Sequence, residues 1–294
     1  SFISRNFKQA DYVERQSGLC ELALHNFPLL GLGHIRIHNR DGVSYLQEML
    51  PVDCLFLDPA RRDGHGGKTV AISDCEPDVT VLEPLLVDKA KKVMVKLSPM
   101  LDLSLALNEL KTVRAVHIVA VNNECKELLL ILQKESVSSE VSIHCEHIAG
   151  NGESRHYTFT LKQEKTSPCL LADEVGTYLY EPNAAILKAG AFRSLTQTYP
   201  VAKLHLNSHL YTSVSLVPDF PGRRFRVEAV SGFGKKELKA FLMDMDKANI
   251  TIRNFPLSVA ELRKRLKLKE GGDDYIFATT LSGGQKVLIR GKKC

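Results

Sequence analysis

The stretch that decides the fold is LFLDPARR, residues 55–62. It continues an apolar run that starts at Val52, and such a run is typical of a strand buried on both faces of a parallel sheet. Asp58 and Pro59 end the strand, because proline has no backbone N–H to donate to a neighbouring strand. The segment therefore predicts a buried strand whose carboxyl end carries a rigid loop with a carboxylate and two arginines.

Strand and helix signals alternate over the first 135 residues around this stretch. An alternation of this kind predicts a parallel sheet covered by helices. The Asn122-Asn123 turn predicts that a returning strand adds an antiparallel edge. We expect strands at 10–14, 35–38, 52–57, 92–97, 115–121 and 127–133, and helices at 18–30, 42–49, 76–88 and 101–110.

The remaining sequence predicts smaller α+β modules. A hairpin is expected at 141–162 across Gly150-Asn151-Gly152, and residues 163–176 have the composition of a linker. Residues 218–222, PDFPG, mark a further break. We expect strands at 202–206, 210–216, 225–230, 251–253, 275–281 and 286–290, and helices at 183–195, 235–248 and 258–266.

Acidic residues follow three successive strands of the predicted sheet. Glu14 ends the first strand, Asp41 and Gly42 follow the second, and Asp58 ends the third. Ligands of open α/β sheets bind at the carboxyl ends of the strands. A carboxylate at the first position suits the two hydroxyls of a ribose, and one after the next strand suits an adenine amino group. Each acid alone is more often a helix cap, but the ordered set points to a nucleoside site.

Residues 1–135 resemble a class I S-adenosylmethionine (SAM)-dependent methyltransferase domain. LFLDPARR is similar to the Asp-Pro-Pro or Asp-Pro-Ala-Arg motif of RNA methyltransferases. With VKLSPM at 95–100 and YEPNA at 180–184, the chain resembles a bacterial methyltransferase family with ferredoxin-like and THUMP-like C-terminal domains. The resemblance implies a Rossmann-like methyltransferase sheet followed by small α+β modules. The implied domains are 1–165 (methyltransferase-like), 177–222 (ferredoxin-like) and 223–294 (THUMP-like).

The resemblance also implies residue roles. Glu14 corresponds to the acid that binds the ribose of SAM, and Asp41 with Gly42 corresponds to the contacts on the adenine side. Asp58 corresponds to a further residue that contacts the cofactor. Asp58, Pro59 and Arg61 correspond to the catalytic loop beside the methyl group, and Arg62 and His65 are candidates for substrate contacts. Uracil-C5 methyltransferases with a similar loop need a cysteine on the loop after the next strand. Residues 97–100 read LSPM here, so a nitrogen or oxygen acceptor is expected.

The methyltransferase domain class opens with a strand and a Gly-rich turn that holds the methionine end of SAM. Residues 1–7 resemble the helix that follows this turn. We therefore expect an N-terminally incomplete sheet without its first strand. We also expect the 294-residue chain by itself to bind SAM poorly and to lack activity.

Charge is distributed unevenly along the chain. The net charge is +5, but residues 222–294 hold 17 Lys/Arg against 8 Asp/Glu, a net +9. A basic module on a mildly acidic body is expected of a nucleic-acid-binding protein, although a solvated basic surface has the same composition. The candidates for RNA contact are Lys235, Lys236, Arg263 and Lys264.

Other classes of protein are disfavoured. No apolar run approaches the ~20 residues of a membrane span. Seven dispersed cysteines without a CxxC pair are typical of reduced thiols in a cytoplasm. His144, Cys145 and His147 do not share one face of a strand, so no metal is expected. LSGGQ at 281–285 lies between two expected strands and is interpreted as a hairpin turn.

The favoured function is SAM-dependent methylation of RNA, with tRNA or rRNA as substrate. Two alternatives remain from the sequence. The first is a methyltransferase-like RNA-binding protein without catalysis, which would bind RNA but not the cofactor. The second is a methyltransferase of protein or small molecules, which would bind the cofactor without salt-sensitive RNA binding.

Overall fold

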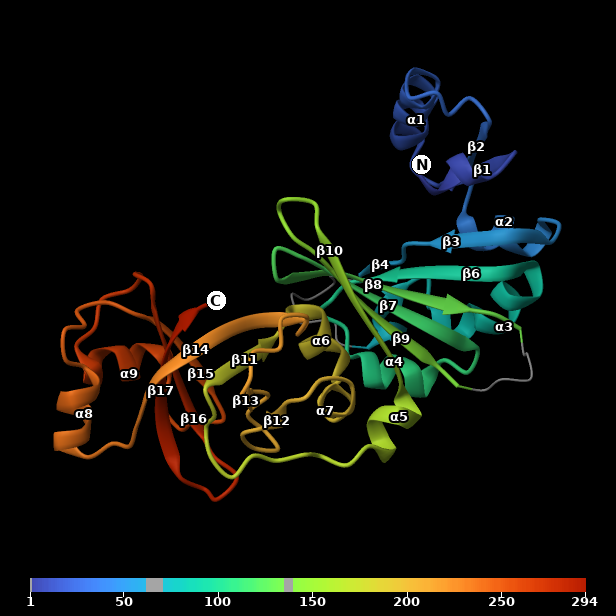
Figure 1. Cartoon of the computed structure of the whole chain (residues 1–294). Coiled ribbons are helices and arrows are strands. Elements are labelled where there is room, and N and C mark those ends of the chain that lie inside the picture. The colour runs from blue at the N-terminus through green and yellow to red at the C-terminus, as the bar shows by residue number, and fades with distance from the viewer. Residues whose placement is uncertain (1, 62–70, 135–139) are drawn as a thin grey trace. The chain divides into compact units, whose positions relative to one another are not determined.

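The computed structural model describes residues 2–61, 71–134 and 140–294 (Figure 1). The chain forms two compact units, one within residues 1–114 and 130–139 and the other within 115–129 and 140–294. The predicted mixture of parallel strands, helices and smaller α+β modules is confirmed. Among the described residues, no helix is both long and apolar enough to cross a membrane.

The first unit opens with a parallel pair of strands, β1 (Ala10–Glu14) and β2 (Ile35–Asn39). Helix α1 (Ser17–Leu29) connects them, as a parallel crossover requires. Gly31 follows this helix with φ +70°, the left-handed conformation of a helix C-cap. Among the described residues, a four-residue 3₁₀ helix, η1 (Ile3–Asn6), lies before β1. The helix expected over residues 1–7 is therefore reduced to one short turn.

A second parallel pair follows in the same unit, β3 (Val52–Leu57) and β6 (Ala90–Leu97). Strand β6 buries alternate residues Val93, Val95 and Leu97. The expectation that β3 is buried on both faces is wrong, because Phe56 is 44% exposed. The physical reason is its position, since β3 is the last strand of its sheet among the described residues.

Strands β7 (Val113–Val121) and β8 (Glu124–Leu132) each contribute residues to both units. Asn122 and Asn123 connect them with φ values of 51° and 63°, which the two-residue turn of a β-hairpin requires. The sheet has the strand order β10-β9-β7-β8-β6-β3. Helices of the first unit are α2 (Gly42–Glu48), α3 (Val79–Lys89) and α4 (Leu103–Glu109).

In the second unit, β9 (Ser142–Ile148) pairs in parallel with β7 and antiparallel with β10 (Ser154–Thr160). The hairpin across Gly150–Gly152 is thus confirmed. The prediction of a linker over residues 163–176 is wrong for its first residues. Helix α5 (Leu161–Thr166) occupies this stretch, because the Thr160 hydroxyl caps it by accepting from the Gln163 N–H at 3.1 Å.

One seven-stranded sheet contains both modules that the sequence predicts after residue 177. Strand β11 of the first module pairs antiparallel with β14 of the second, from Tyr178 opposite Arg226 to Pro182 opposite Gly222. The strand order is β12-β13-β11-β14-β17-β16-β15. Its strands are β11 (Tyr178–Pro182), β12 (Ala202–Lys203), β13 (Tyr211–Ser213), β14 (Gly222–Ser231), β15 (Asn249–Arg253), β16 (Asp274–Thr280) and β17 (Lys286–Lys293).

Two expected helices of this unit are shorter than predicted. The helix expected at 183–195 is two, α6 (Ala184–Ala189) and α7 (Ser194–Thr198), because Gly190 adopts φ +73° and ends the first. The helix expected at 235–248 ends early as α8 (Lys235–Phe241). Helix α9 (Val259–Leu266) agrees with its prediction. The LSGGQ segment is the turn between β16 and β17, as expected.

Candidate active site

Glu14 ends β1 directly opposite Asn39, the last residue of β2. The Asn39 side chain donates to the Glu14 backbone oxygen at 3.0 Å, which fixes the two strand ends together. One carboxylate oxygen of Glu14 accepts from the Gln16 N–H at 2.8 Å. A carboxylate can accept about four hydrogen bonds, so Glu14 retains the capacity to accept from hydroxyl groups.

Asp41 lies just beyond the end of β2 and caps α2, whose first residue is Gly42. Its carboxylate accepts from the Ser44 N–H at 2.8 Å and from the Ser44 hydroxyl at 2.9 Å. The Ser44 backbone N–H is the main cause of the lowered pKa of Asp41. Asp41 thus performs the capping role that acids after strands commonly have, and it stays ionised and exposed.

Asp58 follows β3 at its carboxyl end, as the sequence predicts. Its carboxylate forms an ion pair with the Lys96 ammonium at 2.9 Å, and the Asp58 side chain is 53% exposed. Lys96 lies on β6, where Val95 is the partner of Leu57. Pro59 is buried, which anchors the loop that presents Asp58 to solvent.

The segment after Asp58 forms a short antiparallel pair that the sequence did not predict. Strand β4 (Ala60–Arg61) pairs with β5 (Cys75–Glu76). Glu76 then forms an ion pair with Arg15, the residue after Glu14, at 3.0 Å. This exposed pair is a contact between the residue after β1 and strand β5, which pairs with the residues that follow Pro59.

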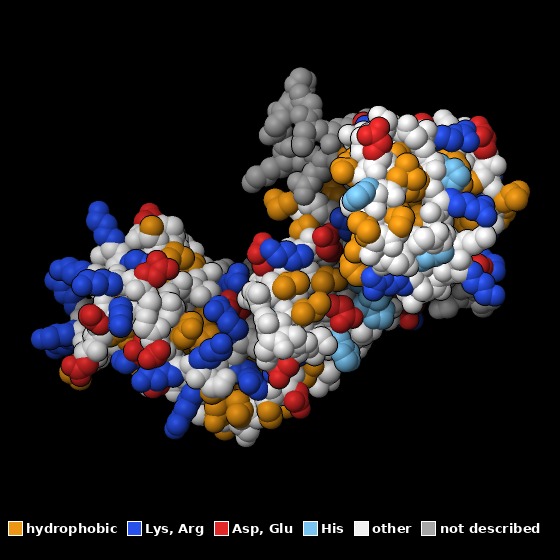
Figure 2. All heavy atoms as spheres, turned by 90° about the horizontal axis from the view of Figure 1, so that it is seen from above, with side chains coloured by type: hydrophobic (Ala, Val, Ile, Leu, Met, Phe, Trp, Pro, Cys, Tyr) orange, Lys and Arg blue, Asp and Glu red, His pale blue; other side chains and the backbone are white. Residues whose placement is uncertain are grey.

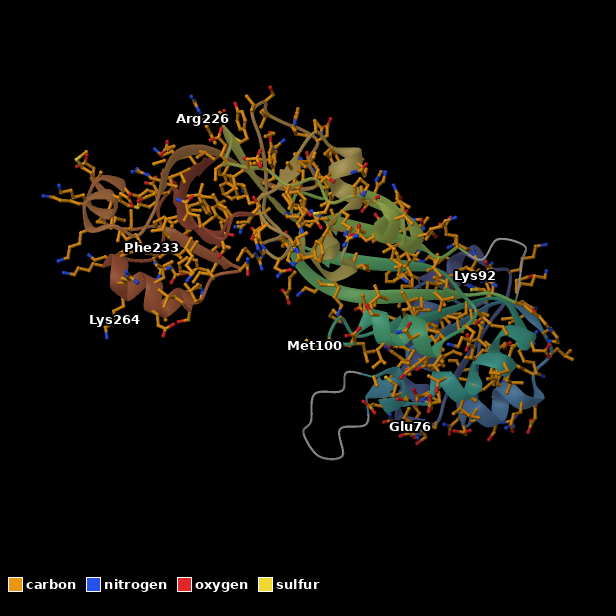
Figure 3. All side chains as sticks on the ribbon, turned by 90° about the horizontal axis from the view of Figure 1, so that it is seen from below. Glu76, Lys92, Met100, Arg226, Phe233 and Lys264 are labelled. Atoms are coloured by element: carbon orange, nitrogen blue, oxygen red, sulfur yellow. The ribbon has the colours of Figure 1, made fainter. Side chains whose placement is uncertain are left out.

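The loop after β6 contains Ser98, Pro99 and Met100. The Met100 N–H donates to the Ser98 hydroxyl oxygen at 3.2 Å, and Met100 is 54% exposed. Figure 3 shows Met100 and Lys92 at opposite ends of β6, with Met100 beyond the carboxyl end. This loop presents a hydroxyl and a thioether where uracil-C5 enzymes need a thiol.

Some of the predicted site residues cannot be placed. Arg62 and His65 lie outside the described residues, and only the backbone of Arg61 is described. Sequence reasoning missed Arg15, Glu76 and Lys96. A period-two signal could have found Lys96, because 92, 94 and 96 alternate with the buried valines of β6, but no local pattern indicates the Arg15–Glu76 pair.

The candidate RNA-binding residues lie in the second unit. Lys235, Lys236 and Lys264 are exposed on α8 and α9. Arg263 is half-buried and donates to the Ala248 backbone oxygen at 3.1 Å, so part of its role is to hold α9 against the chain before β15. Figure 2 shows many Lys and Arg side chains over the C-terminal part of this unit.

The histidines and the cysteine of β9 do not form a metal site. His144 contacts the Ser142 and Thr158 hydroxyls at 3.0 and 3.1 Å, whereas the His147 ring accepts from the Asn123 N–H at 3.1 Å. Cys145 is buried, and burial raises the pKa of its thiol. Across residues 2–61, 71–134 and 140–294, no group of three or more His, Cys, Asp or Glu could hold a metal ion.

Comparison with known proteins identifies two domains of this chain and one related crystal structure. The sequence matches a family described as a ferredoxin-like domain over residues 178–221 and one described as THUMP domain-like over 222–293. No curated protein sequence matches the chain. A crystal structure described as a "putative methyltransferase from Porphyromonas gingivalis W83" is 36% identical, with a TM-score of 0.87. The match covers 98% of this chain and 72% of that one.

The chain belongs to the family of that protein. The expected methyltransferase-type α/β fold, followed by ferredoxin-like and THUMP-like modules, is thereby confirmed. The matched segments meet between Pro221 and Gly222, at the first residue of β14.

Proposed function

We propose that this protein is a SAM-dependent methyltransferase that acts on RNA, with tRNA or rRNA as substrate, at a nitrogen or oxygen acceptor. The observation that supports the proposal is the position of Glu14 and Asp58 at the carboxyl ends of β1 and β3 in the first unit, with Asp41 just beyond β2. The exposed Arg15–Glu76 ion pair is a contact between the segment after Glu14 and the strand that pairs with residues 60–61. The family relationship supports the methyltransferase class.

Several of these residues suit the nucleoside end of SAM. Glu14 offers a half-buried carboxylate that accepts from the backbone N–H of Gln16, and it has further capacity to accept from ribose hydroxyls. Asp41 is ionised and exposed beside Gly42, which suits the adenine side. When bound, SAM supplies a methyl group on a positively charged sulfur.

Asp58 would orient the acceptor. Its carboxylate is exposed and held by Lys96, so it can accept a hydrogen bond from an acceptor N–H or O–H. This contact would direct the acceptor lone pair toward the methyl group that SAM would supply, and the Asp58 carboxylate would take up the proton that the acceptor loses on methylation. Such a reaction depends on alignment more than on strong acid–base assistance. No cysteine is required in this scheme, in agreement with LSPM at 97–100.

The THUMP-like segment supports RNA as the substrate class. Its net charge of +9 favours a polyanion, and its exposed lysines on α8 and α9 are accessible to phosphates. A substrate of low molecular weight would not need a surface of this size and charge.

The test is transfer of labelled methyl groups from SAM to RNA by the full-length protein. Asp58→Asn should lower transfer by about 100-fold or more, because a misaligned acceptor loses most of the advantage of positioning. The matched control is Asp53→Asn, since Asp53 also lies on β3 and pairs with a lysine of β6, Lys91, at 2.7 Å. The control should retain wild-type transfer.

Three outcomes contradict parts of the proposal. Wild-type transfer by Asp58→Asn would remove Asp58 from the active site. Label that enters protein and resists ribonuclease would reject RNA as the substrate. RNA binding without any transfer would favour the non-catalytic alternative.

A further inference from the structure

A small pocket opens in the second unit among the loop before α8, the loop after β15, α9 and the start of β17. Its volume is about 320 Å³. Figure 3 labels Phe233 and Lys264 in this part of the molecule. The lining residues are Phe233, Phe255, Pro256, Leu257, Arg265 and Lys286.

Two aromatic rings form the apolar part of the pocket. The Phe233 and Phe255 rings are stacked, with centroids 5.2 Å apart and an interplanar angle of 28°. The Arg265 guanidinium lies over the Phe233 ring at 5.3 Å from its centroid. Aromatic rings beside a guanidinium are the surfaces on which unpaired bases stack, because every base has a π-face.

These rings are held in place by the core beneath them. Phe233, Phe255 and Leu257 all pack against the buried cluster that contains Phe241 and Leu262. Both rings are nevertheless only half-buried. A platform that is packed on a buried cluster and partly open has few side-chain conformations to lose when a base stacks on it.

The charge of the pocket suits a nucleotide. Among the described residues that line the pocket there are two cations, Arg265 and Lys286, and no carboxylate. The nearest acids along the chain accept local hydrogen bonds instead: Glu237 from the Gly234 N–H at 3.3 Å, and Glu261 from the Ser258 N–H at 2.8 Å. A phosphate beside the pocket would therefore meet the two cations without a carboxylate in the lining to oppose it.

We propose that this pocket binds one unpaired base of an RNA strand, which stacks on the Phe233–Phe255 pair while Arg265 and Lys286 contact the adjacent phosphate. A volume of about 320 Å³ lies at the lower end for ligand pockets, so it suits one base rather than two. The inference deepens the proposed function and rests on RNA being the substrate. It assigns to the THUMP-like segment a base-stacking site in addition to a basic surface.

The first experiment places a fluorescent reporter in the pocket. The chain contains no tryptophan, so Phe233→Trp introduces a single one and retains an aromatic ring for stacking. The probe is a 12-nucleotide single-stranded oligoadenylate, and the control is polyglutamate of equal charge. Oligoadenylate should quench the tryptophan emission, and polyglutamate should not.

The second experiment separates stacking from charge. Phe233→Leu and Phe255→Leu preserve apolar packing but remove a ring, and each should weaken oligoadenylate binding about five-fold or more. The dependence of log K on log salt should not change in either variant, since both retain every cation that faces a phosphate. Lys264→Ala is the matched control and should lower that slope by about 0.7. Thermal unfolding of each variant checks that the fold is retained.

Each outcome decides the inference. Wild-type affinity in both leucine variants, together with no quenching in Phe233→Trp, would overturn the proposal that the pocket binds a base. If RNA binding remained salt-sensitive in that case, the proposed substrate class would still stand. Quenching by polyglutamate and not by oligoadenylate would overturn it in favour of an acidic protein partner. Failure of the unaltered protein to bind any RNA would overturn both the pocket and the proposed substrate class.

Discussion

His209 is a histidine that the second unit keeps neutral. Its ring stacks on Phe192 with centroids 3.7 Å apart, and among the described residues its buried Nδ1 has no hydrogen-bond partner. Burial is the main reason that the pKa of His209 is lowered to about 4, and the charges of Lys203 and Arg253 add to the effect. The protonated ring is therefore disfavoured in the folded state.

This residue makes the second unit less stable in acid. Between pH 6.5 and pH 4 the unfolded chain protonates His209 and the folded chain does not, so stability falls as the pH falls through this window. The contribution has a slope of at most about 1.4 kcal/mol per pH unit. His209→Asn should make the loss shallower, because asparagine tolerates the φ of 54° at this position. Hydrogen exchange of peptides covering residues 201–213, at several pH values, measures the local stability in the unaltered protein and in His209→Asn. Identical slopes of stability against pH in the two proteins would contradict the prediction.

At the residue scale, the sequence predicted where the acidic residues of the site lie, but it did not predict the long-range ion pair beside them. Glu14, Asp41 and Asp58 all follow strands, because strand ends leave local signals in apolar runs and turn residues. Arg15 and Glu76 are 61 positions apart and meet only through the tertiary fold. No periodicity indicates such a pair, so the structure was needed to connect the two segments.

At the scale of elements, Glu181 joins three strands of the seven-stranded sheet. It lies on β11, is 2% exposed, and accepts from Arg223 of β14 and Arg253 of β15. The Arg223 Nε donates at 2.8 Å and the Arg253 Nη2 at 2.9 Å. A buried carboxylate needs such partners, because desolvation of an unpaired charge is costly.

Glu181→Gln should therefore destabilise the second unit. We expect a loss of about 2–3 kcal/mol, below the value for a fully buried pair because each arginine side chain is 35% exposed and can be rehydrated. Asp53→Asn breaks a pair whose side chains are both largely exposed, and it should leave the stability unchanged. Thermal unfolding measures both variants, and equal melting temperatures for the two would refute a role for Glu181 in joining the strands.

Element boundaries were predictable where a run of residues has clear turn signals at both ends. Strands β1 and β3 have the predicted bounds, since each is a run of five or six residues with clear ends. Strands β4 and β5 have two residues each and show no periodicity. The break at Gly190 was missed because its neighbours all favour a helix, and only the left-handed φ separates α6 from α7.

At the scale of the whole molecule, the basic segment 222–294 cannot be deleted without also removing strands of the seven-stranded sheet. The first half of strand β14, residues 222–226, pairs with the whole of β11, and β14 is also the neighbour of β17. Deletion of residues 223–294 would therefore strip β11 of a partner and would not isolate the effect of charge. Substitution of exposed lysines avoids this, because their side chains are solvated and hold no strand in place.

Lys235→Ala, Lys236→Ala and Lys264→Ala should together lower the salt dependence of RNA binding. Removing one lysine that neutralises a phosphate reduces the slope of log K against log salt by about 0.7 on single strands. The triple variant should therefore reduce the slope by up to about 2. Binding titrations at several salt concentrations measure this, and an unchanged slope would assign these lysines to a solvated surface.

The close approach of Gly222 to the Glu181 backbone limits how the two matched segments can be separated. A Cβ on Gly222 would lie 2.1 Å from the Glu181 backbone oxygen, so glycine is needed where the THUMP-like match begins against the ferredoxin-like strand. A gene rearrangement that moved only residues 222–293 would carry β14 away from the strand it fits. A protease that cut the chain between residues 221 and 222 would likewise release neither half, because the sheet would hold them. The boundary between the two matched segments therefore lies inside one continuous sheet, and neither segment keeps all of its strand pairing without the other.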